Sequence, residues 1–278
     1  MAVTPRDTHD PFGLEPPEGM IDASVGSHPM KGDGHATPEM SLFSYHLVHT
    51  SVRSALHAIW SPSLPGNVPG LVHAEFMTVM TLGSPIFSPS RMLFEQVAVF
   101  AQWEDDAAID EYLENDRLGR MLAGGWHARL FFLRQWGSIS GFEIPEENIE
   151  AAPDSPVVAV TLARMKMFQV PRFISWGRPV EKLVRDHPGT TLSLASIRLP
   201  RTVSTFSIWR SEKEMTDMVR GHSSVPQPKR HADAMKERDR KDFHFEFTTL
   251  RFKPISEFGE WNGRTKIIPA SISTDEWA

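Results

Sequence analysis

The sequence contains no cysteine. This absence excludes disulfide bonds, thiolate nucleophiles, zinc–thiolate sites and iron–sulfur clusters, and it is typical of a reducing compartment. Tyrosine is scarce, with only Tyr45 and Tyr112 in the chain. No segment approaches about 18 uninterrupted apolar residues, and the first residues lack a basic-then-apolar signal pattern. We therefore expect a soluble, cytoplasmic protein with no transmembrane segment, which leaves contact with a membrane surface open.

An excess of positive charge is also lacking. The formal net charge is −6 and the pI is near 6.1, so we expect no nucleic-acid partner, which would need a local basic patch. The cations between Lys229 and Lys241 alternate with acidic residues and indicate a solvated helix face. A hydrophobic content of 40% in 278 residues is sufficient for a sizeable core.

Residues 1–40 show almost no apolar periodicity. They contain six prolines, several glycines and the histidines His9, His28 and His35. This composition predicts a flexible arm, and the spacing of its histidines suits no metal site.

A regular order of elements begins at Ser41. Alternating and 3.6-residue apolar patterns predict a strand, a helix, two strands, a helix and a strand, with Thr50 or Ser51 as the cap of the first helix. The predicted ranges are 42–49, 51–60, 71–82, 96–103, 105–122 and 126–140. This β-α-β-β-α-β order is typical of a ferredoxin-like unit.

The same order returns after a linker rich in proline and acidic residues, between Pro145 and Pro156. We predict strands and helices over 157–167, 170–185, 190–199, 203–209, a helix opened by Ser211, a loop over 221–228, a helix carrying His231 and a strand over 243–252. Short segments of the two halves also echo one another in the same order, such as Val99 to Glu104 and Thr205 to Arg210. Their shared order favours an internal duplication.

The predicted fold class is α+β, with two tandem ferredoxin-like units packed as a pseudo-dimeric α+β barrel, because each four-stranded sheet has an apolar face that must be buried. The predicted organisation is an N-terminal arm over 1–40, a first unit over 41–144, a linker over 145–155 and a second unit over 156–278.

The second half differs from the first by extra length between Gly221 and Lys241, which holds His222 and His231. An insertion in one copy indicates the half that carries a site. On the residues alone, His231 is a surface or half-buried helix histidine. The polar face of the last strand, with His244 and Glu246, is then simply solvent-facing.

Four motifs follow one another in this half. They are Thr205-Phe206-Ser207-Ile208-Trp209, His231-x-x-Ala234-Met235, Glu246 with Arg251-Phe252, and Gly259-x-Trp261-Asn262-Gly263. Together with the strand Ala163-Arg164-Met165-Lys166, the set resembles the spheroidene monooxygenase family of carotenoid-modifying oxygenases. The resemblance covers the second half; the first half shares only the plan of elements.

This resemblance implies a haem b protein that uses O2 and an electron donor to oxidise a hydrophobic small molecule. Related haem-carrying barrels, such as aldoxime dehydratases, hold the iron through a histidine on the late helix of the second unit, which here is His231. The resemblance also implies contacts of the cofactor with Trp209 and Glu246. With no thiolate in the chain, only His, Met or Tyr can be the axial ligand.

Activation of bound oxygen needs hydrogen-bond donors in a dry pocket. The polar residues set in apolar strands are the candidates for a catalytic role: Arg164, Lys166, His244 and Arg251. For each of them, a charge that reaches solvent or a haem propionate is the alternative interpretation.

Other functions stay open. A haem lyase of the aldoxime dehydratase type would use His244 as an acid or base and consume no oxygen. A barrel that binds haem or an apolar ligand without catalysis, and a cofactor-free monooxygenase, are further alternatives. The proline-rich arm and the loop Ser84 to Ser90 have no counterpart in the family, so the substrate does not transfer. Association of two chains into a homodimer is also left open.

Overall fold

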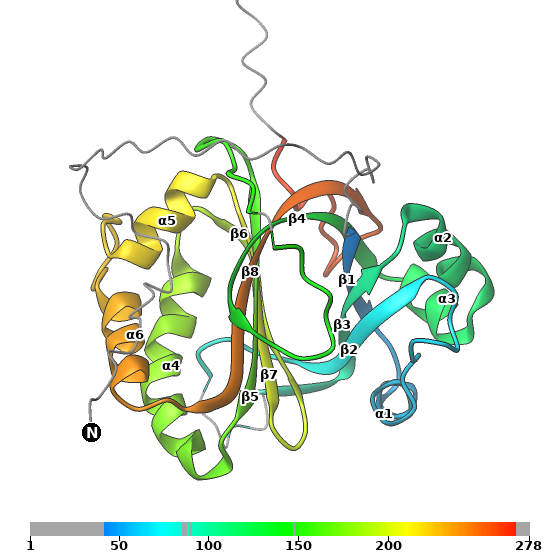
Figure 1. The fold of residues 1–278 in the computed structure, drawn as a ribbon, viewed down its shortest axis with the longest axis horizontal. Helices are drawn as coiled ribbons and strands as arrows, with labels where there is room; N and C mark the ends of the chain where they lie inside the picture. The colour runs from blue at the N-terminus through cyan, green and yellow to red at the C-terminus, as the bar shows by residue number, and fades with distance from the viewer. Residues whose placement is uncertain (1–41, 85–87, 89–90, 147, 271–278) are drawn as a thin grey trace, which may run out of the picture. The chain divides into compact units, whose positions relative to one another are not determined.

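The computed structural model describes residues 42–84, 88, 91–146 and 148–270 (Figure 1). The chain divides into two units at residue 39, and the description below concerns the second, Met40–Ala278. The predicted N-terminal arm, with its three histidines, lies outside the described residues, as does most of the loop 84–90. Among the described helices, none combines the length and the apolar character needed to cross a bilayer.

The order of elements matches the predicted duplication. The strands are β1 Leu42–His49, β2 Leu71–Met80, β3 Met92–Trp103, β4 Trp126–Ser138, β5 Val157–Met165, β6 Thr190–Arg198, β7 Thr202–Trp209 and β8 His244–Phe258. The helices are α1 Val52–Trp60, α2 Asp106–Asn115, α3 Arg117–Ala123, α4 Val170–Asp186, α5 Glu212–Arg220 and α6 Arg230–Arg240, with a 3-10 turn η1 at Met167–Gln169.

The described strands close into one antiparallel barrel in the order β1-β3-β2-β6-β7-β5-β8-β4. Each half keeps the ferredoxin-like order, β4-β1-β3-β2 in the first and β8-β5-β7-β6 in the second. The halves meet at two seams, a short one between β2 and β6 and a long one between β4 and β8. The predicted α+β barrel of two ferredoxin-like units is confirmed.

The inside of the barrel is filled by side chains from both halves. Phe43, Phe100, Phe132 and Phe252 contact one another there, and Tyr45 stacks on Phe206 with 3.8 Å between ring centroids. Burial raises the pKa of Tyr45. Aromatic side chains of this size bury large apolar areas, so this interior supplies the main core of the fold.

Local signals set the ends of most helices. Ser51 caps α1 and Ser211 caps α5, each with its hydroxyl accepting a backbone N–H three residues on. The single helix predicted over 105–122 is wrong. It is broken into α2 and α3 at Asp116, whose carboxylate accepts the amides of Leu118 and Gly119 and so starts a new helix.

Two strands are longer than predicted. β3 begins at Met92 instead of Gln96, because residues 92 and 93 continue the ladder with β2 after a register shift. β8 runs to Phe258 instead of ending at Phe252. A bulge near Pro254 lets the pairing with β4 continue.

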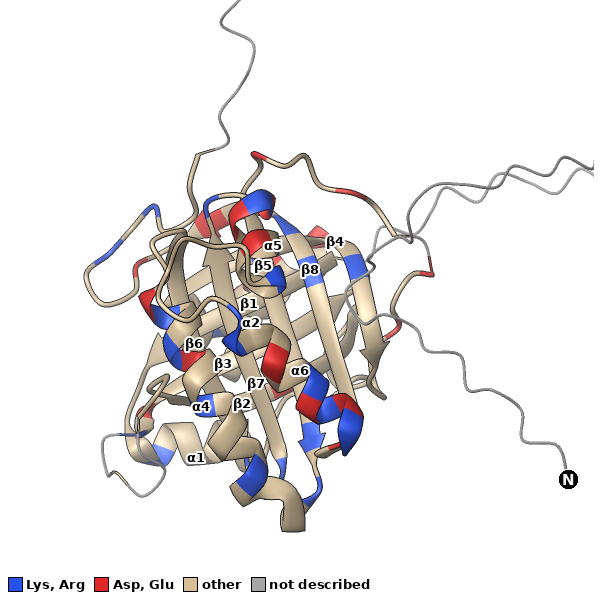
Figure 2. Ribbon diagram, turned by 90° about the vertical axis from the view of Figure 1, so that its left-hand side faces the viewer, with Lys and Arg blue, Asp and Glu red and all other residues tan. Residues whose placement is uncertain are grey.

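Helices cover the outer face of each half. α1, α2 and α3 pack on the first, where buried side chains such as Trp103, Ile109 and Tyr112 form a continuous cluster. α4, α5 and α6 lie over the second half (Figure 2). There, α4 buries only Leu183 of its 17 residues, and α6 buries only Ala234 of its 11. The helix layer of the second half is therefore loosely packed on its sheet.

Candidate functional site

Two separate apolar clusters join α4, α5 and α6 to the outer face of the second sheet. One cluster contains Ala163, Met165, Val170, Phe173, Val203, Phe243 and Phe247. The other contains Leu133, Val157, Leu183, Val184, Trp209, Met215 and Met218. α4 contributes its two ends, since its first turn belongs to one cluster and its last turns to the other. The middle of the helix lies over a part of the sheet that neither cluster fills.

Small polar residues occupy this middle part of the sheet. Thr161, Thr205 and Thr249 lie side by side on β5, β7 and β8, and several of their neighbours along the strands belong to the two clusters, such as Ala159 and Ala163. Thr205 is exposed although helices lie over its face of the sheet, and the other two are half-buried. The hydroxyls of Thr161 and Thr249 are 3.3 Å apart and hydrogen bonded. We call the region between these threonines and the middle of α4 the helix–sheet slot.

Gly177 forms part of the roof of the slot. It lies four residues after Phe173 and seven before Val184, so the helical period places it on the face of α4 that looks toward the sheet. A Cβ atom at this position would meet only the ring of Phe173, at 3.6 Å or more. A glycine in the interior of a helix costs about 1 kcal/mol relative to alanine. The missing side chain is consistent with space kept open above the threonines.

His231 points its face of α6 toward the same slot. Seven residues later on this face, the guanidinium of Arg238 lies 4.7 Å from the ring centroid of Phe247 on the outer face of β8. Since residues seven apart share one side of a helix, His231 lies on the same inner side of α6 as Arg238. The side chain is half-buried and its Nδ1 atom is buried. The predicted helix around His231 is therefore confirmed, and the imidazole lies on its inner side.

The environment of His231 keeps it neutral. Desolvation lowers the pKa of His231 to about 4, and the charge of Arg238 adds to this, although a hydrogen bond to the backbone of Val219 acts in the opposite direction. A backbone group that raises the pKa of an imidazole is an acceptor, so the ring donates an N–H to the carbonyl of Val219. A neutral imidazole oriented by such a bond carries a lone pair on its second nitrogen, which is the form that metal ions bind.

His244 is a second buried imidazole at one end of the slot. It contacts the rings of Phe173 and Phe247, and its Nδ1 lies 3.2 Å from the carboxylate of Asp242. Burial lowers the pKa of His244 to about 4. A neutral His244 whose Nδ1–H donates to Asp242 has its lone pair on Nε2, which is buried and has no hydrogen-bond partner among the described residues. This nitrogen is able to accept a proton.

Arg251 lies at the other end of the slot, beneath α5. Its guanidinium is 4.4 Å from the ring centroid of Trp136 and donates to Glu212 over 2.6 Å. Burial and the nearby charges of Arg134 and Arg220 together lower the pKa of Arg251 to about 10 against the opposing effect of Glu212, so it stays protonated at neutral pH. The charges of two further guanidinium groups act at this position, which makes this end of the slot suited to an anionic group.

The remaining predicted residues divide between the two faces of the sheet. Trp209 is buried in the cluster under α5, and its indole N–H donates to Ser207. Lys166 is half-buried at the end of β5, next to the turn η1. Arg164 and Glu246 point to the inside of the barrel, on the face opposite to the slot, and form an ion pair with each other. The structure thus places His244 and Arg251 on the outer face of the second sheet and His231 in the helix layer that covers it, and it separates Arg164 and Glu246 from them.

Arg164 belongs to a charged cluster at one mouth of the barrel. Its centre is Glu75, which is fully buried, forms an ion pair with Arg198 at 2.8 Å, and hydrogen bonds Arg164 over 3.3 Å and His73 over 3.4 Å. Burial alone would raise the pKa of Glu75, but the hydrogen bond from His73 and the charges of the two arginines outweigh it and lower the pKa. This geometry favours a structural role for Arg164.

Glu75→Gln should therefore weaken the fold without affecting the slot. Removing the carboxylate leaves Arg198 without an acidic partner and Arg164 with Glu246 alone, and because both guanidinium groups are partly exposed, we expect a loss of about 2 kcal/mol in the free energy of unfolding. Urea titration of this variant and of the exposed control Glu260→Gln measures the effect. Equal stability of the two variants would show that the cluster does not hold the barrel mouth.

Acidification should destabilise the protein through its buried histidines. Burial lowers the pKa of His127, His231 and His244 to about 4, and it also lowers the pKa of His46 well below its usual value. In the unfolded chain these groups titrate near pH 6.5, so the unfolded state binds more protons in the window between the two values. The free energy of unfolding should fall by on the order of 2 kcal/mol or more between about pH 7 and about pH 5. Urea unfolding at both pH values measures this, and equal midpoints would contradict the prediction.

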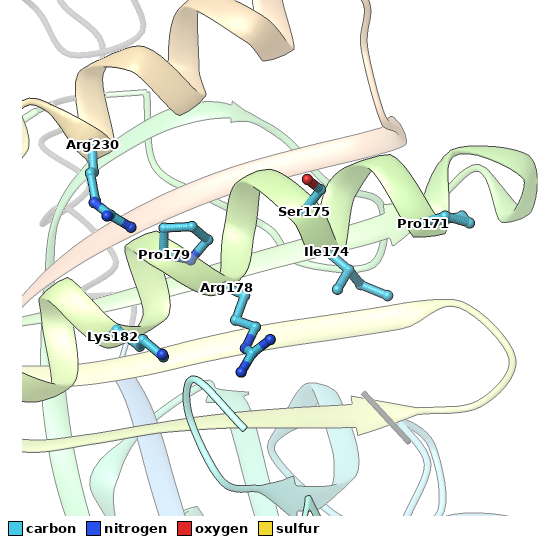
Figure 3. A pocket seen from close by; sticks show the side chains of 7 residues that line it. All are labelled: Pro171, Ile174, Ser175, Arg178, Pro179, Lys182 and Arg230. Carbon is cyan, nitrogen blue, oxygen red and sulfur yellow. The ribbon is translucent and has the colours of Figure 1, made fainter. Parts of the chain in front are cut away.

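An open pocket lies on another side of α4 (Figure 3). Its volume is about 420 Å³, and it is lined by Pro171, Ile174, Ser175, Arg178, Pro179, Lys182 and Arg230. None of these lining residues is a histidine, methionine or tyrosine, so this pocket offers no axial ligand to an iron atom. The helix–sheet slot remains the better candidate site.

Sequence reasoning missed the small residues that make the slot. The threonines lie in ordinary strand patterns, and only the pairing of the strands shows that they form one row. Gly177 offered a local signal, since a glycine inside a helical pattern indicates a packing or functional reason. The threonines that lie across the slot from Gly177 could be recognised only in the folded structure.

No family model matches the chain. It is 27% identical over 130 residues to a spheroidene monooxygenase of Rhodobacter capsulatus, a match that covers 46% of this chain and 51% of the relative. It is 24% identical over 176 residues to a spheroidene monooxygenase of Cereibacter sphaeroides, covering 61% and 52%. The matched region therefore spans about half the length of these curated relatives.

A solved aldoxime dehydratase, in complex with butyraldoxime, is similar in fold. The TM-score is 0.50 at 9% identity, and the match covers 80% of this chain and 82% of the other. The chain is an α+β barrel of the ferredoxin-like type. At this identity the similarity describes the fold alone, and it supports the same tandem arrangement that the strand order shows.

Proposed function

We propose that the protein is a haem b-dependent monooxygenase that uses O2 and an external electron donor to oxidise a hydrophobic small molecule. The observation that carries the proposal is the helix–sheet slot with the neutral, sheet-facing imidazole of His231. The similarity to spheroidene monooxygenases supports the oxidoreductase class. A carotenoid-like compound is one candidate substrate.

The residues of the slot fit a flat, largely apolar group that carries anionic substituents. The glycine of α4 and the threonines of the sheet keep the middle open, while phenylalanines form the wall at the end near His244. Arg251, Arg134 and Arg220 make the other end positive, which suits the propionates of haem. A site that is apolar at one end and cationic at the other suits such a cofactor.

In this proposal His231 is the axial ligand. The carbonyl of Val219 fixes the tautomer of the ring and its orientation, a second-shell contact that tunes a bound metal. Haem bound there would supply the activation of O2. The chain itself binds the cofactor, excludes water with the phenylalanine wall, and places the buried Nε2 of His244 where it is able to accept or return a proton.

The experiment is a titration of the purified protein with haemin, followed by oxygen-electrode measurements with a reductant and an apolar test substrate. We expect a saturable Soret band at one haem per chain and oxygen uptake that requires both reductant and substrate. A protein that takes up no haem would reject the proposal, and a coloured protein without substrate-dependent oxygen uptake would reject the monooxygenase class.

A haem lyase of the aldoxime dehydratase type is the second candidate. The observation that favours it is His244, whose buried Nε2 faces aromatic side chains and is positioned to exchange a proton with a bound substrate. In a lyase His244 acts as the acid or base of a dehydration. Nitrile formation from an aldoxime under anaerobic, reducing conditions would favour this candidate over the oxygenase.

A further inference from the structure

Three chain segments are tied together at one end of the barrel. The amide of Met165 donates to the carbonyl of Arg201, which joins the end of β5 to the β6–β7 turn. The amide of Lys166 donates to the carbonyl of Phe243, which joins η1 to the beginning of β8. All three segments lie at the lower end of the molecule in Figure 1. They form one connected surface that we call the barrel tip.

The barrel tip exposes large apolar side chains on three separate segments. They are Met167 at 52% and Phe168 at 99% exposure on η1, Leu199 at 71% in the β6–β7 turn and Phe245 at 62% near the start of β8. A phenylalanine that is almost fully exposed in a short turn gains nothing from its position in the folded chain. Exposed apolar patches of this kind mark contacts with a partner or a membrane.

Cations accompany these apolar side chains. Lys166 and Arg201 flank the turns, and Lys241 ends α6 close to the start of β8; within the described residues, none of the three forms an ion pair. The guanidinium of Arg201 lies 5.4 Å from the ring centroid of Phe245. Blue segments of the ribbon in Figure 2 mark the Lys and Arg residues at this lower end. Because the whole chain has a net charge of −6, this group of unpaired cations beside exposed apolar side chains is a property of the barrel tip and not of the protein as a whole.

We propose that the barrel tip docks on the surface of an anionic lipid bilayer, with Phe168, Leu199 and Phe245 inserted among the acyl chains and the cations at the headgroups. Apolar insertion together with basic residues is the combination that holds peripheral proteins on such membranes. Full burial of the four apolar side chains would remove on the order of 500 Å² from water, which is less than the roughly 800 Å² that each partner of a specific protein complex buries. Separate protruding turns also suit a fluid bilayer better than a rigid protein surface.

This proposal does not depend on haem or on the proposed function. Docking rests on the tip residues alone, and the protein is tested as purified, with and without added haemin. The first cluster of apolar residues under α4, which contains Phe243 and Phe247, lies directly behind the tip. A docked barrel would therefore have the His244 end of the slot close to the bilayer.

Vesicle cosedimentation tests the proposal. We expect the protein to bind vesicles of phosphatidylcholine mixed with phosphatidylglycerol, and to bind them more weakly as salt is added, because salt screens the attraction of exposed charges. The double variant Phe168→Ser/Leu199→Ser should bind at least about tenfold more weakly, since two inserted side chains are lost. The double variant Arg201→Gln/Lys241→Gln should lose about fivefold for each cation.

The matched control is Trp60→Ser, which removes another exposed aromatic side chain, of 81% exposure, from α1 on β2 and β3. It should bind vesicles as the parent does, and thermal unfolding should show all variants folded. An equal loss in the control would place the contact elsewhere and overturn the proposal. So would equal binding to pure phosphatidylcholine vesicles. Absence of vesicle binding, with a dimer in gel filtration that Phe168→Ser/Leu199→Ser dissociates, would identify the tip as a protein interface instead.

Discussion

Replacing His231 with alanine is expected to abolish stable haem uptake. If His231 is the axial ligand, its loss removes the iron–nitrogen bond and should weaken haem binding by more than about 100-fold, since even the loss of second-shell partners costs about 10- to 100-fold. The Soret absorbance during a haemin titration measures the effect. Added imidazole should restore the band in the variant, because the free base can enter the space that the side chain leaves.

The control for this experiment is His222→Ala. His222 lies in the loop before α6, in the same inserted segment, and its own amide donates to the carbonyl of Asp217. We expect its haem affinity to equal that of the parent. Circular dichroism should show both variants folded, because His231 is only half-buried. Full Soret absorbance in His231→Ala without imidazole would mean that another residue holds the iron.

Filling the slot from the roof should have the second largest effect. Gly177→Leu places a branched side chain between α4 and the threonines of the sheet. We expect the affinity for haem to fall at least tenfold, which is roughly the free-energy cost of adding bulk to a space that haem would already fill. The protein without haem should be as stable as the parent or more so, because leucine is a better helix former than glycine by about 0.8 kcal/mol. Haemin titration and thermal unfolding measure the two effects separately.

Two variants control for this substitution. Gly177→Ala adds only a Cβ atom, which would meet the Phe173 ring at an ordinary contact distance, so it should stabilise α4 and keep haem binding. Ser175→Leu adds the same bulk as the test variant on the exposed side of α4 and should leave haem binding unchanged. If Gly177→Leu binds haem as tightly as Gly177→Ala, the cofactor does not lie beneath this turn of the helix.

The barrel was predictable because its signals are local and repeated. Alternating apolar residues mark each strand, and a helix cap follows Trp103 and Trp209 at the same distance, at Asp105 and Ser211. These two tryptophans end the third strand of their units, as the predicted duplication requires. The helix break at Asp116 was not predicted because the apolar pattern continues across it, whereas the carboxylate of Asp116 caps a new helix.

The site was less predictable because it depends on which face of a strand looks inward. Arg164 and Arg251 are both cations in apolar strands, yet one points into the barrel mouth and the other lies beneath α5. An alternating apolar pattern shows which residues share a face of a strand, but it does not show which face meets the helices. The face that meets the helices is decided when the two sheets close into one barrel, which depends on contacts between residues far apart in the sequence. The assignment of His231 as the ligand stays a prediction.

The two halves of the barrel differ in how tightly their helices pack on the sheet. Beneath α1, α2 and α3 the space is packed, and the void beside His46 has no room for a water molecule. Such a half tolerates little change but anchors the long β4–β8 seam. Its loosely packed counterpart can then change residues around α4 and α6 over evolution at small risk to the fold, while the first half is preserved.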